Sequence, residues 1–255
     1  MLKLLKAKAF AKKHVRRYRE GRNVFTHPVF VDTKAKTEKE LSKGPQRSDI
    51  INFLLSQING PTTYLEIGVC DPANNFDLIV ADKKYSVDPG LEFFENPVDF
   101  KITSDEFFAQ LGENKILSSD IQFDLIFIDG LHLAAQVDRD ITNALPYLSE
   151  DGFIVLHDCN PPTEWHAREN HLYRLTPARN FWNGTTWKAF LKWRSSHLVH
   201  SCCIDSDWGV GVLSKKRNFG GLSPIHNEFY EYGWFDQHRV QSLNLISFRE
   251  FKEFF

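Results

Sequence analysis

Residues 123–132, FDLIFIDGLH, form the strongest strand pattern in the chain. The run is short, rich in branched and aromatic side chains, and ends at Asp129, which favours a buried strand over a helix. Apolar residues then recur three or four positions apart across residues 134–148, which is the spacing of one helical face. A buried strand followed by an amphipathic helix is the repeating unit of a parallel α/β sheet.

The same alternation continues on both sides of this stretch. We expect further strands at residues 64–69 (YLEIGV), 84–88 (KYSVD) and 152–157 (GFIVLH). Helices are expected at residues 50–58, 76–81, 106–111 and 186–193, the third of them capped by Ser104 or Asp105. Residues 199–204 and 209–213 complete the pattern as two strands of a terminal hairpin. The predicted fold class is therefore α/β, a mostly parallel sheet with helices on both faces and a terminal antiparallel hairpin.

The composition fits one enlarged globular domain. Of 255 residues, 42% are hydrophobic and 25% are charged, which excludes a largely disordered, collagen-like or disulfide-scaffold protein. We divide the chain into a basic helical arm with its linker (1–45), a central α/β domain (46–215) and an aromatic-rich C-terminal extension (216–255). The linker is expected in the polar residues 33–48, around Gly44 and Pro45.

The charge of the chain is unevenly distributed. Residues 1–22 contain nine Lys and Arg and one Glu, a net charge of +8, which leaves 22 basic and 32 acidic residues, a net charge of −10, in the remainder. The arm also has helical spacing of its apolar residues Leu4, Ala7, Ala11, Val15 and Tyr18. It is either a solvated helix packed on the body or a segment attracted to an anionic surface, phospholipid or RNA.

The sequence predicts a soluble, cytoplasmic protein. Its four cysteines have no CxxC spacing and fit a reducing compartment, and lysines interrupt the N-terminal apolar residues where a signal peptide needs an unbroken run. No apolar run approaches the roughly 18 residues of a membrane span. Residues 1–22 are the candidate for peripheral attachment to the inner face of a membrane.

Polar residues stand at the ends of four expected strands. In an open α/β sheet ligands bind beyond the carboxyl ends of the strands, so these residues are expected on one edge. An Asp after a strand also commonly caps the next helix, but four such ends together indicate a site. The residues are Glu66, Gly68, Asp88, Asp129, His132, His157, Asp158 and Asn160.

The pattern favours a nucleoside cofactor without phosphates. Asp88 ends the second strand, where an acidic side chain can accept hydrogen bonds from both ribose hydroxyls. The turn after the first strand reads GVCDPA from Gly68, which lacks the three glycines of a dinucleotide-binding loop and argues against NAD. S-adenosylmethionine is the cofactor that fits.

The motifs YLEIGV, KYSVDPG, FDLIFIDGLH and GFIVLHDCNPP resemble those of class I S-adenosylmethionine-dependent methyltransferases, which have a Rossmann-like fold. The similarity covers residues 50–213 and is greatest to bacterial small-molecule and sugar O-methyltransferases with a D-G-x-H element. It implies that Glu66 and Gly68 lie along the methionine part of the cofactor, that Asp88 binds the ribose, and that Ser104 or Asp105 approaches the adenine. Asp129 would lie next to the cofactor. Cys70 and Pro72 stand where the family has its second and third glycines.

Methyl transfer to oxygen requires an aligned hydroxyl and the removal of its proton, and the sequence offers two devices for this. His132 is a candidate general base. Asp129, Asp158 and Asn160 form an all-oxygen set suited to Mg²⁺ or another divalent cation. The two devices are compatible, with Asp129 taking part in catalysis beside His132.

The expected acceptor is a saccharide or a related small hydroxylated metabolite. Its pocket is expected in residues 161–183 and the tail 229–255, where aromatic and arginine side chains gather. Two other functions stay open: an RNA methyltransferase anchored by the arm, which the acidic body disfavours, and a silent binding module that keeps the fold without the cofactor. The sequence also leaves open whether the protein is a homo-oligomer.

Overall fold

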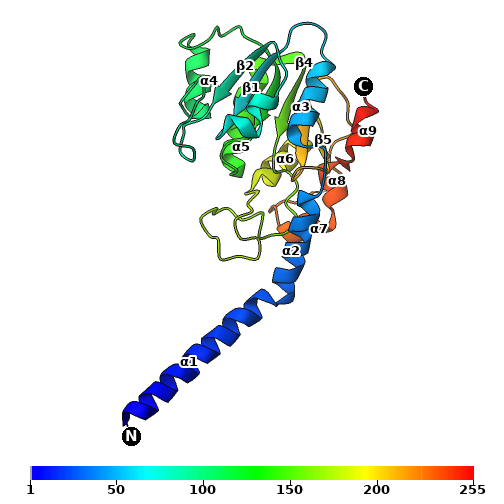
Figure 1. Ribbon diagram of the computed structural model, residues 1–255. Coiled ribbons are helices and arrows are strands. Elements are labelled where there is room, and N and C mark those ends of the chain that lie inside the picture. Colours follow the sequence, from blue (N-terminus) through cyan, green and yellow to red (C-terminus); the bar gives the residue numbers. More distant parts are fainter. Residues whose placement is uncertain (1, 225) are drawn as a thin grey trace.

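The computed structural model describes residues 2–224 and 226–255, and of residues 2–5, 7 and 9 the backbone alone (Figure 1). Met1 and the side chains of Leu4 and Ala7, which belong to the predicted arm, lie outside the described part. Most of the chain forms one body, and a long helix, α1 (Leu2–Phe25), projects from it.

A single mixed sheet forms the centre of the body, with the strand order β2-β1-β3-β4-β6-β5-β7. The first four strands in this order are parallel, β6 is antiparallel to both β4 and β5, and β7 is parallel to β5. This arrangement confirms the predicted fold class, including the terminal hairpin. The strands are β1 (Thr63–Ile67), β2 (Lys83–Val87), β3 (Phe123–Ile128), β4 (Leu148–Leu156), β5 (His200–Ile204), β6 (Val210–Ser214) and β7 (Leu245–Ile246).

Helices cover both faces of the sheet, and β3 shows how the faces divide. Ile126 and Ile128 point into a core with α4 (Ser104–Gly112), α5 (Ala134–Ala144) and α6 (Thr186–Arg194), whereas Leu125 and Phe127 point into a second core with α3 (Arg47–Ser56). Because both faces are buried, residues 125–128 of this strand read as a continuous apolar run. The remaining elements are α2 (Pro28–Leu41), α7 (Tyr232–Gln237), α8 (Arg239–Leu243), α9 (Phe248–Lys252), and the 3₁₀ turns η1 (Pro72–Asn74), η2 (Phe76–Leu78) and η3 (Leu145–Tyr147).

Residues 33–48 are not the polar linker that the sequence predicts. Most of them belong to α2, which starts with His27 as N-cap, its Nδ1 accepting from Val29 N, and with Pro28 in the first turn. The residues of α2 that pack on the body are polar, so the helix has no apolar periodicity to reveal it. They are Thr33, Thr37 and Glu40.

Two further expectations are wrong in detail. The N-cap of α4 is Thr103, which forms a capping box with Glu106, so neither Ser104 nor Asp105 caps this helix. The helix expected at residues 76–81 is only the 3₁₀ turn η2. Neither correction affects the predicted strands of the sheet.

No helix in the described part of the chain combines the length and apolar character needed to cross a membrane.

Candidate active site

The loops that follow β1 and β3 cross in direct backbone contact. Asp129 N donates to Ile67 O at 2.8 Å, and Gly68 N donates to Val87 O at 2.9 Å. Gly68 has a φ of 85°, and a Cβ atom on it would lie 2.2 Å from the Cα of Gly130. Only glycine fits there, and the crossing holds the segment that follows β3 against the end of β1.

A compact group of ionisable side chains follows β3 and β4. His132 Nε2 lies 3.1 Å from Asp129 Oδ1, and His132 Nδ1 lies 2.9 Å from Asp158 Oδ2. One ligand atom from each of the three residues lies within 4.8 Å of the others. The side chains of His132 and Asp129 are 18% and 16% exposed, so the group is partly accessible to solvent.

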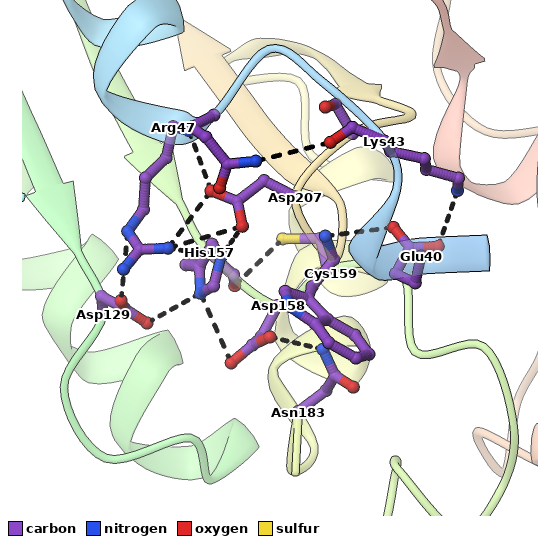
Figure 2. A network of polar contacts seen from close by, with 12 residues as sticks. Glu40, Lys43, Arg47, Asp129, His157, Asp158, Cys159, Asn183 and Asp207 are labelled. Carbon is purple, nitrogen blue, oxygen red and sulfur yellow. Dashed lines mark hydrogen bonds and ion pairs between the residues drawn. The ribbon is translucent and has the colours of Figure 1, made fainter. Parts of the chain in front are cut away.

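Three residues complete the network: His157, expected from the sequence next to Asp129 or Asp158, and Arg47 and Asp207, which the sequence analysis did not mention (Figure 2). His157 Nδ1 lies 3.2 Å from Asp129 Oδ1, and its Nε2 lies 3.3 Å from Asp207 Oδ1. Arg47, at the start of α3, pairs with Asp207 at 3.2 Å and approaches Asp129 at 4.0 Å. Three cationic groups thus face the three carboxylates of Asp129, Asp158 and Asp207.

The charges of this network shift the pKa values of its members and so set their protonation states. Burial alone would lower the pKa of His132, but Asp158 and Asp129 outweigh it and raise the pKa to about 10. His157 is likewise buried, and the same two carboxylates hold its pKa well above the ordinary value. Burial would raise the pKa values of Asp129 and Asp158, yet the two histidines lower both. At neutral pH the group therefore consists of ion pairs, with His132 as an imidazolium.

A loop between β4 and α6 covers His132. The ring of Trp182 stacks on the imidazole with centroids 5.0 Å apart at 17°, and Asn183 Nδ2 donates to Asp158 Oδ1. Thr185 N donates to His132 O at 2.7 Å, and a Cβ on Gly184 would lie 2.1 Å from the same oxygen. The loop thus fixes the backbone of His132. The turn dipeptide Asn183-Gly184 was the sequence signal for this loop.

The turn after β1 accommodates Cys70 and Pro72 at the positions where the family has glycines. Cys70 has a φ of 50°, and its N–H donates to Asp88 Oδ2 at 2.9 Å. Asp88 Oδ1 accepts from Gly90 N at 2.6 Å. Pro72 stands in the first turn of η1, where a missing N–H costs no hydrogen bond. The structure therefore places the Asp88 carboxylate directly against this turn, beside Gly68.

Ser104 and Asp105 face α5. Ser104 Oγ donates to Asp140 Oδ1 at 2.6 Å, and Asp105 Oδ2 lies 3.4 Å from Arg139 Nε. Both side chains thus join α4 to α5, at the start of α4.

The structure does not bring Asn160 to the carboxylates of Asp129 and Asp158. Its Nδ2 donates to Asp205 Oδ1 at 3.1 Å, and its Oδ1 accepts from Arg239. The side chains beside the two carboxylates are instead those of His132 and His157.

Glu66 lies beneath the site, buried in the sheet. It accepts from Tyr64 Oη at 2.5 Å and from Asn75 Nδ2 at 2.9 Å. Burial is the largest cause that raises its pKa, to about 7. The carboxyl group is therefore partly protonated near neutral pH.

We expect this shift to make stability depend on pH. Between the ordinary pKa and about 7 the folded state keeps a proton that the unfolded state has lost, so stability falls as pH rises through this window. The loss is at most about 3 kcal/mol. Glu66→Gln removes this titration. The unfolding free energy of the variant minus that of wild type, measured by urea titration, should therefore be about 3 kcal/mol larger at about pH 8 than at about pH 4. A difference that does not change with pH would contradict the burial argument.

One protein family model, described as a methyltransferase domain, matches residues 13–159, more than half of the 255 residues. The chain belongs to this methyltransferase family. The resemblance to class I S-adenosylmethionine-dependent methyltransferases is confirmed by this match, which spans β1 to β4 and includes Asp129, His132 and Asp158. No curated protein matches the methyltransferase in sequence.

Solved structures similar to the methyltransferase include an SAH-bound O-methyltransferase from Bacillus cereus, with 14% identity, a TM-score of 0.45, and coverage of 76% of this chain and 96% of that one. A putative O-methyltransferase from Klebsiella pneumoniae has 14% identity and a TM-score of 0.42, covering 74% and 90%. An SAH-bound methyltransferase from Podospora anserina has 14% identity and a TM-score of 0.42, covering 79% and 95%. The family assignment rests on the domain match.

Proposed function

We propose that this methyltransferase transfers the methyl group of S-adenosylmethionine to a hydroxyl group of a saccharide or a related small hydroxylated metabolite. The observation that carries the proposal is the group of Asp129, His132 and Asp158 at the ends of β3 and β4, partly open to solvent beside the β1 turn. Ligands of such sheets bind at this edge. After His132 has lost a proton to solvent, the group offers a proton acceptor to an incoming hydroxyl and carboxylate ligands to a cation.

The cofactor would lie across the ends of β1, β2 and β3. Asp88 would bind the ribose, with Gly68 and Asp129 along the methionine part and the start of α4, at Ser104 and Asp105, towards the adenine. Glu66 would affect the cofactor only indirectly, through the position of β1, because its carboxyl group is bound to Tyr64 and Asn75.

His132 would take the acceptor's proton. In the transfer, the acceptor oxygen forms a bond to the methyl carbon while the bond from that carbon to the sulfonium sulfur breaks, and the hydroxyl proton passes to a ring nitrogen of His132. Because both nitrogens face carboxylates and the pKa is about 10, one nitrogen must first lose its own proton. Trp182 holds the ring in place throughout.

Asp129 and Asp158 fit a divalent cation, and His132 is the nearest third donor. Carboxylate oxygens suit Mg²⁺, and the donor atoms are close enough to share one ion. When bound, such a cation supplies positive charge that lowers the pKa of a coordinated hydroxyl and of the neighbouring imidazole. Asn160 is left out of this set because its amide is bound to Asp205 and Arg239.

Removal of the cation gives a direct prediction. We expect EDTA to abolish methyl transfer and Mg²⁺ or Mn²⁺ to restore it, since without the cation the pKa values of the acceptor hydroxyl and of His132 are not lowered. Asp129→Asn and Asp158→Asn should each weaken Mn²⁺ binding in a calorimetric titration, whereas the exposed Asp120→Asn should not. Retained Mn²⁺ binding by His132→Ala would assign His132 to proton transfer alone, whereas lost binding would make it the third ligand of the cation. Indifference of activity to EDTA would remove the cation from the proposal.

The loop over residues 161–183 would form the acceptor pocket. It presents Trp182 next to His132, together with Trp165, His171 and Tyr173. Aromatic faces suit a sugar ring, and arginines of the loop suit anionic substituents.

Two measurements test the function. Calorimetric titration with S-adenosylhomocysteine should give binding heat, whereas a silent binding module gives none. Transfer of a labelled methyl group from S-adenosylmethionine is then measured with a panel of monosaccharides, uronic acids and nucleotide sugars, with RNA as the comparison acceptor. Label in RNA alone would replace the proposal with an RNA methyltransferase.

A further inference from the structure

Every described side chain of α1 is exposed. The helix leaves the body at its C-terminal end, where Phe25 packs edge-on against Phe30 with centroids 5.8 Å apart (Figure 1). Helices of this kind gain most of their stability from packing an amphipathic face against something else. We therefore expect α1 to bind a partner along its exposed length.

The two sides of α1 differ in character. At 3.6 residues per turn, Ala11, Val15, Tyr18 and Phe25 fall on one side of the helix. Basic residues occupy the opposite side and its flanks, and Arg22 lies among the apolar residues. The single acidic residue of α1, Glu20, is paired with Arg16 at 3.4 Å. The basic residues of the opposite side and its flanks are Lys6, Lys12, Lys13, Arg16, Arg17 and Arg19.

We propose that α1 docks the protein onto an anionic lipid bilayer. A helix with one apolar stripe and one strongly basic face lies in the plane of the interface, with its apolar side in the boundary between headgroups and acyl chains. The net charge of +8 on residues 1–22 is complementary to anionic headgroups. The helix lies on the bilayer and does not cross it, because it is not apolar enough to span.

The loop that covers the candidate active site adds to this surface. Leu172, Tyr173 and Leu175 are 69%, 60% and 90% exposed. In the same loop, the Arg179 guanidinium lies 5.8 Å from the ring of Phe25, so the loop runs beside the end of α1 (Figure 1). The loop over the candidate active site therefore lies beside the end of α1 that joins the body.

Two other partners, RNA and a second copy of the chain, fit α1 less well. RNA would be held by the basic side, but it gives the apolar stripe nothing to bury. A second copy of α1 packed along the stripe would bring two segments of charge +8 together. A lipid surface satisfies both sides of the helix at once.

Sedimentation of the full-length protein with vesicles tests the docking. We expect the protein to pellet with vesicles of equimolar phosphatidylglycerol and phosphatidylcholine and to stay in the supernatant with phosphatidylcholine alone. Binding should weaken as salt is raised, because the basic side acts through screened charges.

Two sets of variants separate the two sides of the helix. Lys12→Gln, Arg17→Gln and Arg19→Gln together should weaken binding about a hundredfold, whereas Lys83→Gln, Lys101→Gln and Lys115→Gln, which remove the same charge from the body, should not. Val15→Gln with Tyr18→Gln should also weaken binding. Val80→Gln with Leu198→Gln, which alters two exposed hydrophobic residues of the body, is the control and should not. Glutamine is a good helix former, and far-UV circular dichroism checks that α1 persists.

Three results would overturn the proposal. They are equal pelleting with both kinds of vesicle, unchanged binding of the triple arm variant, and a loss of self-association instead of vesicle binding when the arm is altered, seen by sedimentation velocity. A filter assay that finds RNA bound at physiological salt while vesicles are not would assign the arm to RNA.

Discussion

Replacing His132 with alanine is expected to lower kcat by about 10² to 10⁴ while the affinity for S-adenosylhomocysteine stays near the wild-type value. The His132 imidazole lies against both Asp129 and Asp158, at 3.1 and 2.9 Å, and at 18% its side chain is more exposed than that of His157, which contacts the same two carboxylates at 3.2 and 3.5 Å. Its removal takes away the proton acceptor and leaves His157 paired with both carboxylates. Single-turnover methyl transfer and calorimetry measure the two effects separately.

A pH profile distinguishes a base from a purely structural histidine. Because Asp158 and Asp129 raise the pKa of His132 to about 10 against the effect of burial, the base form is scarce at neutral pH. We therefore expect kcat/KM of wild type to rise with pH through the neutral range, and this rise to vanish in His132→Ala. His200→Ala, at the start of β5 across from Ser214 and far from the site, is the matched control. Full activity of His132→Ala would assign the proton to another group.

Gly68→Ala is expected to destabilise the protein by about 4 kcal/mol and to abolish cofactor binding. The added Cβ would lie 2.2 Å from Gly130 Cα and 2.3 Å from Gly130 N, and the backbone φ of 85° is itself unfavourable for alanine. Backbone atoms cannot move aside as a flexible side chain can, so the two loops must separate. Urea unfolding and titration with S-adenosylhomocysteine measure both consequences.

Two other glycines serve as controls for this prediction. Gly60 has a φ of 95° with no atom within 4 Å of an added Cβ, so Gly60→Ala should cost only about 1 kcal/mol from its backbone conformation. Gly130→Ala places its Cβ 3.7 Å from Gly68 Cα, an ordinary contact, and should be tolerated. Equal losses at Gly60 and Gly68 would show that conformation alone, and not the crossing of the loops, sets the cost.

The sheet could be predicted because its central strands are buried on both faces. Residues 125–128 of β3 and 153–156 of β4 therefore read as unbroken apolar runs followed by polar residues, and the order of strands and helices along the chain implies parallel pairing. α2 gave no such signal, since Thr33, Thr37 and Glu40 make its contacts with the body. Thr37 Oγ1, for example, lies 3.1 Å from Nε2 of the buried His166.

The candidate site could be predicted only where it follows neighbouring strands. Asp129 and Asp158 end up together because β3 and β4 are adjacent and parallel. Asn160 does not join them, because the backbone takes a φ of 61° at Asp158 and then pairs with the segment before β6, where Asn160 N donates to Trp208 O. Arg47 and Asp207 come from segments with no fixed spacing to the strand ends, so only the folded chain reveals them.

The separation of charge between α1 and the body gives the protein a large electric dipole moment. The net charge of −2 is small, yet it is the sum of +8 on residues 1–22 and −10 on the remainder. Figure 1 shows that the helix carrying the positive charge extends away from the body. A charged interface therefore exerts a torque on the molecule before contact and selects which end arrives first, although it exerts little net force on the molecule as a whole.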